Sequence, residues 1–400
     1  MQIDFTERND SLRNIKPTLY SEYLISLLNK SLNSEVSSVS EINDIDNLPF
    51  PKDFDFKFLY SLADLHSVAP AVYPAIKNIK STNIELFKTS HQRAWKKTAL
   101  RFIEISSILS KTDEFGINCI PLKGSVIKEY YPSPEMRTMA DIDFLFDINR
   151  LEDIKLIMYQ LGYVPGAESE NQYIFYKEPV MNVEFHPSFF IKGLFNDDYL
   201  NPGWQYACPT GKGKPLRKLT NEGFYIYMMA HIAQHFKFGG AGVRSVMDVW
   251  VFLKRFKKDL DWLFINHELR HAGILEFSNN IKALAGAWFG SRPMTPLTGE
   301  LGKYILQSGT FGKQSNYYKK QLAKGKCVYI IKNLFPAYSV MKNKYPLVKT
   351  PLLLPIGWIV RAFNVIIFKH KTVKGWLFNI NSVNKSSAAD YAEMLKRFGL

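Results

Sequence analysis

The stretch PLKGSVIKEYYPSPEMRTMADIDFLFD, from Pro121 to Asp147, decides the fold of this chain. Apolar runs at residues 117–122 and 138–146 predict two buried strands. A turn at Gly124-Ser125 follows the first strand and leads into a short helix. A strand, a tight turn and a helix in this order offer backbone N–H groups to phosphate oxygens. The stretch therefore predicts a small sheet with a phosphate-binding turn at its edge.

Acidic side chains are placed on the predicted sheet in a pattern that suggests a metal site. Asp141 and Asp143 are two residues apart, so a strand presents both carboxylates on one face. A third acid, Glu184, lies in a second β-rich segment at 181–186. If the two strands are neighbours, three carboxylates converge and can hold two ions about 3.5–4 Å apart. Oxygen ligands favour Mg²⁺, or Mn²⁺ in its place.

Further side chains near these acids suit an anionic substrate. Lys123 and Arg137 add positive charge beside the Gly-Ser turn, and a guanidinium suits phosphate oxygens. His186 shares the face of Glu184, and the sequence leaves open whether it belongs to the site or is satisfied near the end of the sheet. Taken alone, an Asp-x-Asp pair is more often an edge strand with solvated acids; the Gly-Ser turn and Glu184 favour the active-site interpretation.

Together these motifs resemble a known family. The order LKG, YYP, Arg, DIDFL, VEFH, then His-x₃-His, Gly-Gly, Arg and Asp, over about residues 60–290, is similar to the uncharacterised nucleotidyltransferases of the DNA polymerase β-like superfamily. The resemblance implies an α+β nucleotidyltransferase fold and metal-dependent transfer of NMP from an NTP, ATP included. It implies that Asp141 and Asp143 hold two metals and that Glu184 completes the site and acts as base. Lys123, Gly124, Ser125 and Arg137 would bind the nucleotide.

A second group of polar residues lies in the helical segment that follows. His231 and His235 are four apart, as are Arg244 and Asp248. Position 232 is Ile232, so the His-Glu-x-x-His metalloprotease pattern is absent. Two interpretations stay open: Arg244 and Asp248 form an intrahelical ion pair with the histidines packed between helices, or these four residues face a nucleotide cleft.

The domain prediction has four parts, which together give an α+β protein with a small mixed sheet and flanking helical regions. The three cysteines are widely spaced, which argues against a disulfide framework, and no secretory leader is evident, so a cytoplasmic location is expected. The predicted parts are an N-terminal helical region at 1–85, a catalytic domain at 86–205, a helical domain at 215–300 and a basic region at 301–400.

Positive charge is concentrated in the last quarter of the chain. Of the net charge of +14, residues 301–400 contribute +15 from 17 Lys+Arg against two acids, and residues 1–300 contribute −1 from 34 against 35. The apolar segment 351–368 is flanked by lysines between residues 342 and 374, which suits an interfacial helix on an anionic membrane. A core helix with a basic rim and a nucleic-acid surface are the alternatives. No stable DNA complex is expected, because long aliphatic runs do not favour phosphate binding.

The acceptor of the NMP group stays open in the sequence. The candidate acceptors are a sugar or sugar phosphate, a small antibiotic-like molecule, a protein side chain and an RNA end. A rival hypothesis is a catalytically inactive, membrane-associated binding or scaffold protein that keeps the nucleotidyltransferase fold. The pattern of Asp141, Asp143 and Glu184 favours the enzyme hypothesis over the scaffold hypothesis.

Overall fold

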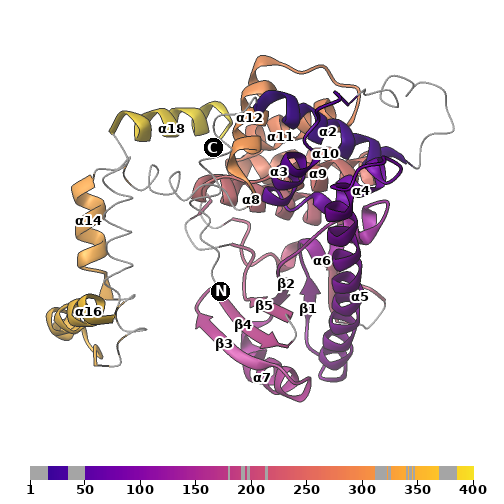
Figure 1. Cartoon of the computed structure of the whole chain (residues 1–400). Helices are drawn as coiled ribbons and strands as arrows, with labels where there is room; N and C mark the ends of the chain where they lie inside the picture. The colour runs from indigo at the N-terminus through magenta and orange to yellow at the C-terminus, as the bar shows by residue number, and fades with distance from the viewer. Residues whose placement is uncertain are drawn as a thin grey trace. The chain divides into compact units, whose positions relative to one another are not determined.

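The computed structural model describes residues 17–34, 50–178, 181–190, 194–195, 199–211, 215–310, 322, 326–338, 341, 345, 347–368 and 385–400. It divides into two compact units (Figure 1). The first combines Met1–Gln234 with Ala241–Thr310, and the second combines His235–Gly240 with Phe311–Leu400.

A five-stranded mixed sheet forms the centre of the first unit, in the order β1-β2-β5-β4-β3. Strands β2 and β5 run parallel, and the other three pairs are antiparallel. Strands β6 and β7 form a separate antiparallel pair. The strands are β1 (Cys119–Pro121), β2 (Ile142–Phe146), β3 (Val164–Ser169), β4 (Gln172–Lys177), β5 (Met181–His186), β6 (Ala207–Pro209) and β7 (Leu216–Leu219).

One face of the sheet is buried by two helices, α5 (Ile84–Glu114) and α7 (Leu151–Gln160). Apolar side chains of β2 and β5 alternate toward these helices, and Phe144 stacks on Phe185 with ring centroids 5.3 Å apart. Figure 1 shows the long α5 running alongside β1. Since alternate residues of a strand point to opposite faces, the polar side chains of β2 and β5 are left on the other face.

Helices from both ends of the first unit pack together. Helix α2 packs against α11, where the side-chain amides of Asn29 and Asn33 donate hydrogen bonds to the backbone carbonyls of Trp288 and Phe289. The helices of this unit beyond α5 and α7 are α2 (Pro17–Asn33), α3 (Phe56–Leu65), α4 (Ala69–Ile76), α6 (Gly124–Ile127), α8 (Asn221–Phe238, whose last four residues count in the second unit), α9 (Val243–Phe256), α10 (Trp262–His271), α11 (Leu275–Phe289) and α12 (Pro296–Ser308). Short 3-10 helices are η3 (Lys128–Tyr130), η4 (Pro134–Met136), η5 (Ile148–Arg150) and η7 (Trp204–Tyr206).

The second unit is helical in its described part. It contains α14 (Lys326–Leu334), the 3-10 helix η8 (Pro351–Leu353), α16 (Leu354–Phe368) and α18 (Lys385–Arg397). The apolar segment 351–368 is therefore η8 and α16. Among the described residues, no helix combines the length and the apolar character that crossing a membrane requires. Of the flanking lysines, Lys349 is described, and positions 342, 344, 369, 371 and 374 lie outside the described residues.

The predicted fold class is confirmed, with three local differences. The strand expected over 117–122 is shorter and comprises only β1 (Cys119–Pro121). The strand expected over 138–146 begins only at Ile142, because the carbonyls of Thr138 and Ala140 accept hydrogen bonds from arginine side chains instead of a neighbouring strand. Strand β3 was not predicted from the sequence. It is an edge strand with mostly exposed side chains and contains Pro165 and Gly166, which weaken the strand pattern.

Candidate active site

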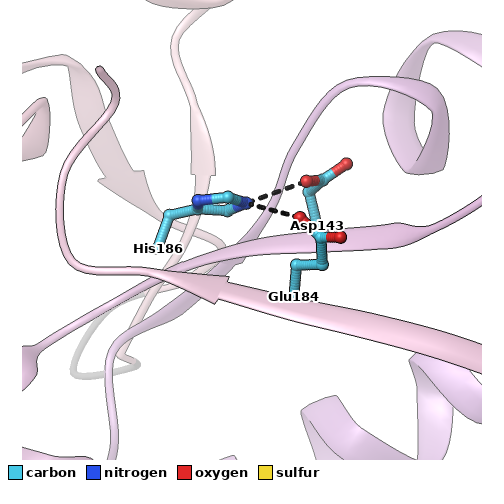
Figure 2. Close-up of side chains that lie close together, drawn as sticks. All are labelled: Asp143, Glu184 and His186. Atoms are coloured by element: carbon cyan, nitrogen blue, oxygen red, sulfur yellow. Dashed lines mark hydrogen bonds and ion pairs between the residues drawn. The ribbon is translucent and has the colours of Figure 1, made fainter. Parts of the chain in front are cut away.

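The parallel pairing of β2 and β5 brings two carboxylates face to face. Asp143 lies opposite Glu184 in the register of the two strands, and His186 follows on the same face of β5. The Nε2 atom of His186 lies 2.9 Å from Oδ1 of Asp143 and 3.7 Å from Oε2 of Glu184 (Figure 2). Ligand atoms of these three residues all lie within 4.8 Å of one another, so they form a compact cluster of donors.

Asp143 is the most enclosed member of this cluster, with 1% of its surface exposed. Its Oδ1 atom also accepts a hydrogen bond from Lys123 Nζ at 2.7 Å. Burial by itself would raise the pKa of Asp143, but the charges of Lys123 and His186 outweigh burial and hold that pKa well below its usual range. Asp143 is therefore a buried carboxylate that stays ionised.

The neighbouring acids behave in the opposite way. Asp141 lies just before β2, and burial together with the charge of Asp143 raises its pKa. Burial and the charges of Asp143 and Asp141 likewise raise the pKa of Glu184. Three acids in one region, two of them with raised pKa values, store electrostatic repulsion that a divalent cation would relieve.

The turn before α6 has an unusual backbone. Lys123 has φ 48° and ψ −125°, a left-handed region that non-glycine residues rarely adopt. This conformation accompanies the Lys123–Asp143 ion pair. Gly124 follows, and a Cβ atom there would lie 3.3 Å from Cβ of Met139 and 3.4 Å from a guanidinium nitrogen of Arg137. The backbone at Gly124 is thus closely covered.

Ser125 differs from its neighbours in having an unpaired side chain. Its residue is 5% exposed, and its hydroxyl oxygen has no hydrogen-bond partner in the described part of the chain. A buried hydroxyl without a partner costs about 1–3 kcal/mol, so its retention favours a role with a ligand.

Arg137 is held by a residue far away in the sequence. Its Nε atom donates to both carboxylate oxygens of Asp248 at 2.7 and 3.0 Å, and its Nη2 atom donates to Oδ2 at 2.8 Å. The hydroxyl of Tyr131 donates to the same carboxylate at 2.6 Å. Helix α9 thereby anchors the loop that leads into β2. The interpretation that Asp248 pairs with Arg244 is wrong, because Arg137 occupies that carboxylate.

Arg244 reaches the same loop by a different route. Its Nη1 atom donates to the carbonyl oxygen of Thr138 at 3.1 Å, and burial lowers its pKa to about 10. Within the described residues it forms no ion pair, although the charges of Asp248 and Asp141 are near enough to act on its pKa. Arg244 is therefore a cation near Asp141 with no carboxylate bound to it.

The two histidines of α8, His231 and His235, belong to different compact units of the chain. The ring of His231 stacks on that of Tyr227 in the first unit, with centroids 5.9 Å apart. His235 belongs to the second unit, where its carbonyl accepts a hydrogen bond from the N–H of Gly240 at 2.9 Å. Neither histidine is in the donor cluster with Asp143 in the described structure.

Tyr227 is a neighbour of the site that the sequence did not reveal. It is 2% exposed, and burial together with the charges of Asp143 and Asp141 raises its pKa, while the charge of Lys123 acts in the opposite direction. Helix α8 thus faces the polar side of the sheet through this ring. Among the aromatic residues of that helix, nothing in the sequence pattern distinguishes Tyr227 from a core residue.

The donor set fits a divalent metal ion. Asp143 and Glu184 offer oxygens, His186 offers a nitrogen, and the three lie within reach of one ion. In the described structure Asp141 is not part of this group of ligand atoms, although it is close enough to Asp143 for the two charges to interact.

This combination of sheet, turn and paired acids is that of a nucleotidyltransferase, an enzyme that transfers phosphorus-containing groups. Residues 52–290 match the family of uncharacterised nucleotidyltransferases, and the chain belongs to this family. The resemblance noted from the sequence is thereby confirmed.

Curated proteins and solved structures give no further information about the function of this chain. No curated protein matches the chain. The solution structure of the antibiotic-resistance factor ANT(2'')-Ia is similar over 46% of this chain and 91% of that chain, with 16% identity and a TM-score of 0.26. A TM-score this low says nothing about the fold or the substrate of the present chain.

Proposed function

We propose that this protein transfers NMP from an NTP to a hydroxyl group of an acceptor, at the face of the sheet that carries Asp143 and Glu184. The observation that carries the proposal is their direct opposition on parallel strands, with Asp143 buried and ionised. Family membership supports the reaction class. Asp141, beside Asp143, is the third acid of the proposed site.

The nucleotide end of the proposed site is formed by Lys123 and by Gly124 and Ser125, the first residues of α6. The unpaired Ser125 hydroxyl is available to a phosphate oxygen of the NTP. Arg137 contributes positive charge while Asp248 fixes its position. Arg244, near Asp141 and without a carboxylate partner among described residues, is proposed to face the same phosphates.

Asp141, Asp143 and Glu184 would hold Mg²⁺ or Mn²⁺ ions. Such ions supply charge stabilisation for the attacking and leaving oxygens of an in-line displacement. The role of the chain is to keep the acids fixed by strand pairing and to keep Asp143 ionised.

In the proposed reaction the acceptor oxygen attacks the α-phosphorus of the NTP. A new bond from oxygen to phosphorus forms, the bond from the α-phosphorus to the bridging oxygen breaks, and pyrophosphate leaves. Glu184 takes the proton of the acceptor hydroxyl. The acceptor is a sugar, another small molecule, a protein side chain or an RNA end.

Nucleotide binding tests the enzyme proposal without knowledge of the acceptor. Equilibrium dialysis would measure binding of each labelled NTP with Mg²⁺ or Mn²⁺, for the wild type and for Asp143→Ala. We expect metal-dependent binding of at least one NTP by the wild type and a loss of about 10-fold or more in the variant. Wild-type protein that binds no NTP with either metal would support the scaffold hypothesis instead.

We also propose that the second unit docks on an anionic membrane surface. Leu352, Ile356, Ile359 and Phe363 are 90%, 48%, 59% and 63% exposed, and their spacing places them on one side of η8 and α16. The basic composition of residues 301–400 complements anionic lipid. These two features together are those of an interfacial helix rather than of a core helix.

Vesicle flotation tests the membrane proposal. The protein should float with phosphatidylserine-containing vesicles and stay behind with neutral phosphatidylcholine vesicles. The double variant Ile359→Glu/Phe363→Glu should lose flotation. Leu263→Glu, at an 86% exposed position on α10, is the matched control and should float as the wild type does. Equal absence of wild-type protein from both lipid fractions would overturn the proposal.

A further inference from the structure

His186 places a ring nitrogen within the donor cluster, beside the carboxylates of Asp143 and Glu184. Asp143 already receives the ammonium group of Lys123 on Oδ1, at 2.7 Å. His186 Nε2 approaches the same oxygen at 2.9 Å and also lies 3.7 Å from Glu184. His186 thus brings a ring nitrogen to both carboxylates of the cluster, in addition to the ammonium group that Asp143 receives from Lys123.

The other nitrogen of the ring is held outside the cluster. Nδ1 of His186 lies 3.3 Å from the backbone carbonyl oxygen of Asn171. A carbonyl can only accept, so Nδ1 carries a hydrogen and donates it; Nε2 likewise carries a hydrogen when it contacts the Asp143 carboxylate, and it would release that hydrogen on binding a metal ion. Metal-binding histidines are commonly oriented in this way, with one ring nitrogen donating to a carbonyl and the other directed at the ion. Figure 2 shows the ring directed at the two carboxylates from β5.

We propose that His186 is a direct nitrogen ligand of one metal ion, shared with Asp143 and Glu184. The inference rests on the proposed function and adds the identity of the ion. Imidazole binds first-row transition ions in preference to Mg²⁺, whereas carboxylates accept both. The site of this chain therefore prefers Mn²⁺ to Mg²⁺.

The ligand can be observed spectroscopically, without any assay of activity. Electron spin-echo envelope modulation of the Mn²⁺-loaded protein detects a directly bound ¹⁴N nucleus. Wild-type protein should show ¹⁴N modulation of histidine type. His186→Gln should lose the modulation and bind Mn²⁺ about 10–100-fold more weakly. His271→Gln, which removes an exposed histidine of α10, is the matched control and should keep both.

Competition by Mg²⁺ provides the second readout. Mg²⁺ should displace Mn²⁺ from His186→Gln at a lower excess than from the wild type, because the nitrogen that favours Mn²⁺ is gone. His186→Asp, which replaces nitrogen by oxygen, should restore binding of Mg²⁺ without restoring the ¹⁴N modulation. This variant also separates loss of a ligand from failure to fold.

The outcomes distinguish the inference from the function on which it rests. Wild-type protein that binds Mn²⁺ and NTP without ¹⁴N modulation overturns the role of His186 and leaves NMP transfer standing. Wild-type protein that binds neither Mn²⁺ nor Mg²⁺, with or without NTP, overturns both proposals.

Discussion

Asp143 on strand β2 lies directly opposite Glu184 on the parallel strand β5. The register is fixed by the apolar residues on the other face, where Phe144 packs on Phe185. A shift of either strand by one residue would turn its own acid into the core, so the same pairing that buries the apolar face also brings the acids together. The geometry of the proposed site is thus a consequence of the core.

Glu184→Gln separates catalysis from stability. Activity should fall about 10²–10⁴-fold, the usual contribution of a general base. The metal-free variant should be as stable as the wild type or more stable, because burial and the charges of Asp143 and Asp141 raise the pKa of Glu184. With a folded-state pKa above that of the unfolded chain, ionisation of Glu184 lowers stability as pH rises through the folded-state pKa. Thermal unfolding between pH 5 and 8 checks this, and a large loss of stability in the variant would contradict it.

Asp248→Asn tests the anchor between α9 and the loop before β2. Removing one partner of a buried ion pair leaves the Arg137 charge uncompensated, at a cost of about 3–5 kcal/mol in the free energy of unfolding. The control is Asp153→Asn, whose pair with Arg150 is 39% and 36% exposed and should contribute about 0–1 kcal/mol. Urea unfolding measures both. Similar small losses in the two variants would mean that the anchor contributes little.

Ser125→Ala should move stability and nucleotide binding in opposite directions. Removing a buried, unpaired hydroxyl should raise the free energy of unfolding by about 1 kcal/mol. NTP binding should weaken about 10-fold, the effect of losing a hydrogen bond to a charged group. Ser31→Ala removes another unpaired buried hydroxyl, on α2, and should stabilise without affecting NTP binding. Unchanged NTP binding in Ser125→Ala would remove Ser125 from the nucleotide site.

Lys128 provides a prediction about pH. It is 1% exposed and donates to Thr98 Oγ1 at 3.0 Å, and burial, with the charges of Arg101 and Arg137, lowers its pKa to about 7. The unfolded lysine has a pKa of about 10.4, so between about pH 7 and 10 the unfolded chain binds more protons at this position. The free energy of unfolding should therefore rise with pH in this window, by up to about 1.4 kcal/mol per pH unit.

Lys128→Met removes that dependence while keeping a side chain of similar length. Urea unfolding of both proteins from pH 6.5 to 9.5 measures the difference in slope. Lys258→Met, at an exposed position after α9, controls for loss of a surface ammonium group. Identical slopes for wild type and Lys128→Met would contradict the prediction.

Local patterns in the sequence were sufficient for the sheet and for part of the site. Alternation of apolar and acidic residues predicted which faces of β2 and β5 are polar, and β5 has the bounds expected from the β-rich segment at 181–186. Side chains of a strand alternate between its two faces every second residue, so such predictions need only neighbouring residues in the sequence. The resemblance of the motifs to a known family then indicated that Asp141, Asp143 and the Gly124-Ser125 turn belong to a nucleotidyltransferase.

Contacts between distant residues could not be predicted in the same way. Asp248 has an arginine at the i−4 position, which favours an intrahelical pair, yet its partner is Arg137 from a loop 111 residues away. Whether Asp248 pairs with Arg244 or with Arg137 depends on how α9 packs beside that loop, and this packing cannot be predicted from a local sequence pattern. Tyr227 is a similar case, because an aromatic residue on a buried helix predicts a core position and gives no indication that a charged cluster lies beside it.

The central claim, transfer of NMP at the acids of β2 and β5, is tested most directly with two labels on one nucleotide. The protein, Mn²⁺ or Mg²⁺ and a fraction of candidate acceptors are incubated with NTP labelled at the α-phosphate or at the γ-phosphate. We predict that the α label enters the acceptor and the γ label leaves in pyrophosphate, and that Asp143→Ala shows neither. Transfer of the γ label to the acceptor, or equal transfer of the α label by wild type and Asp143→Ala, would contradict the claim.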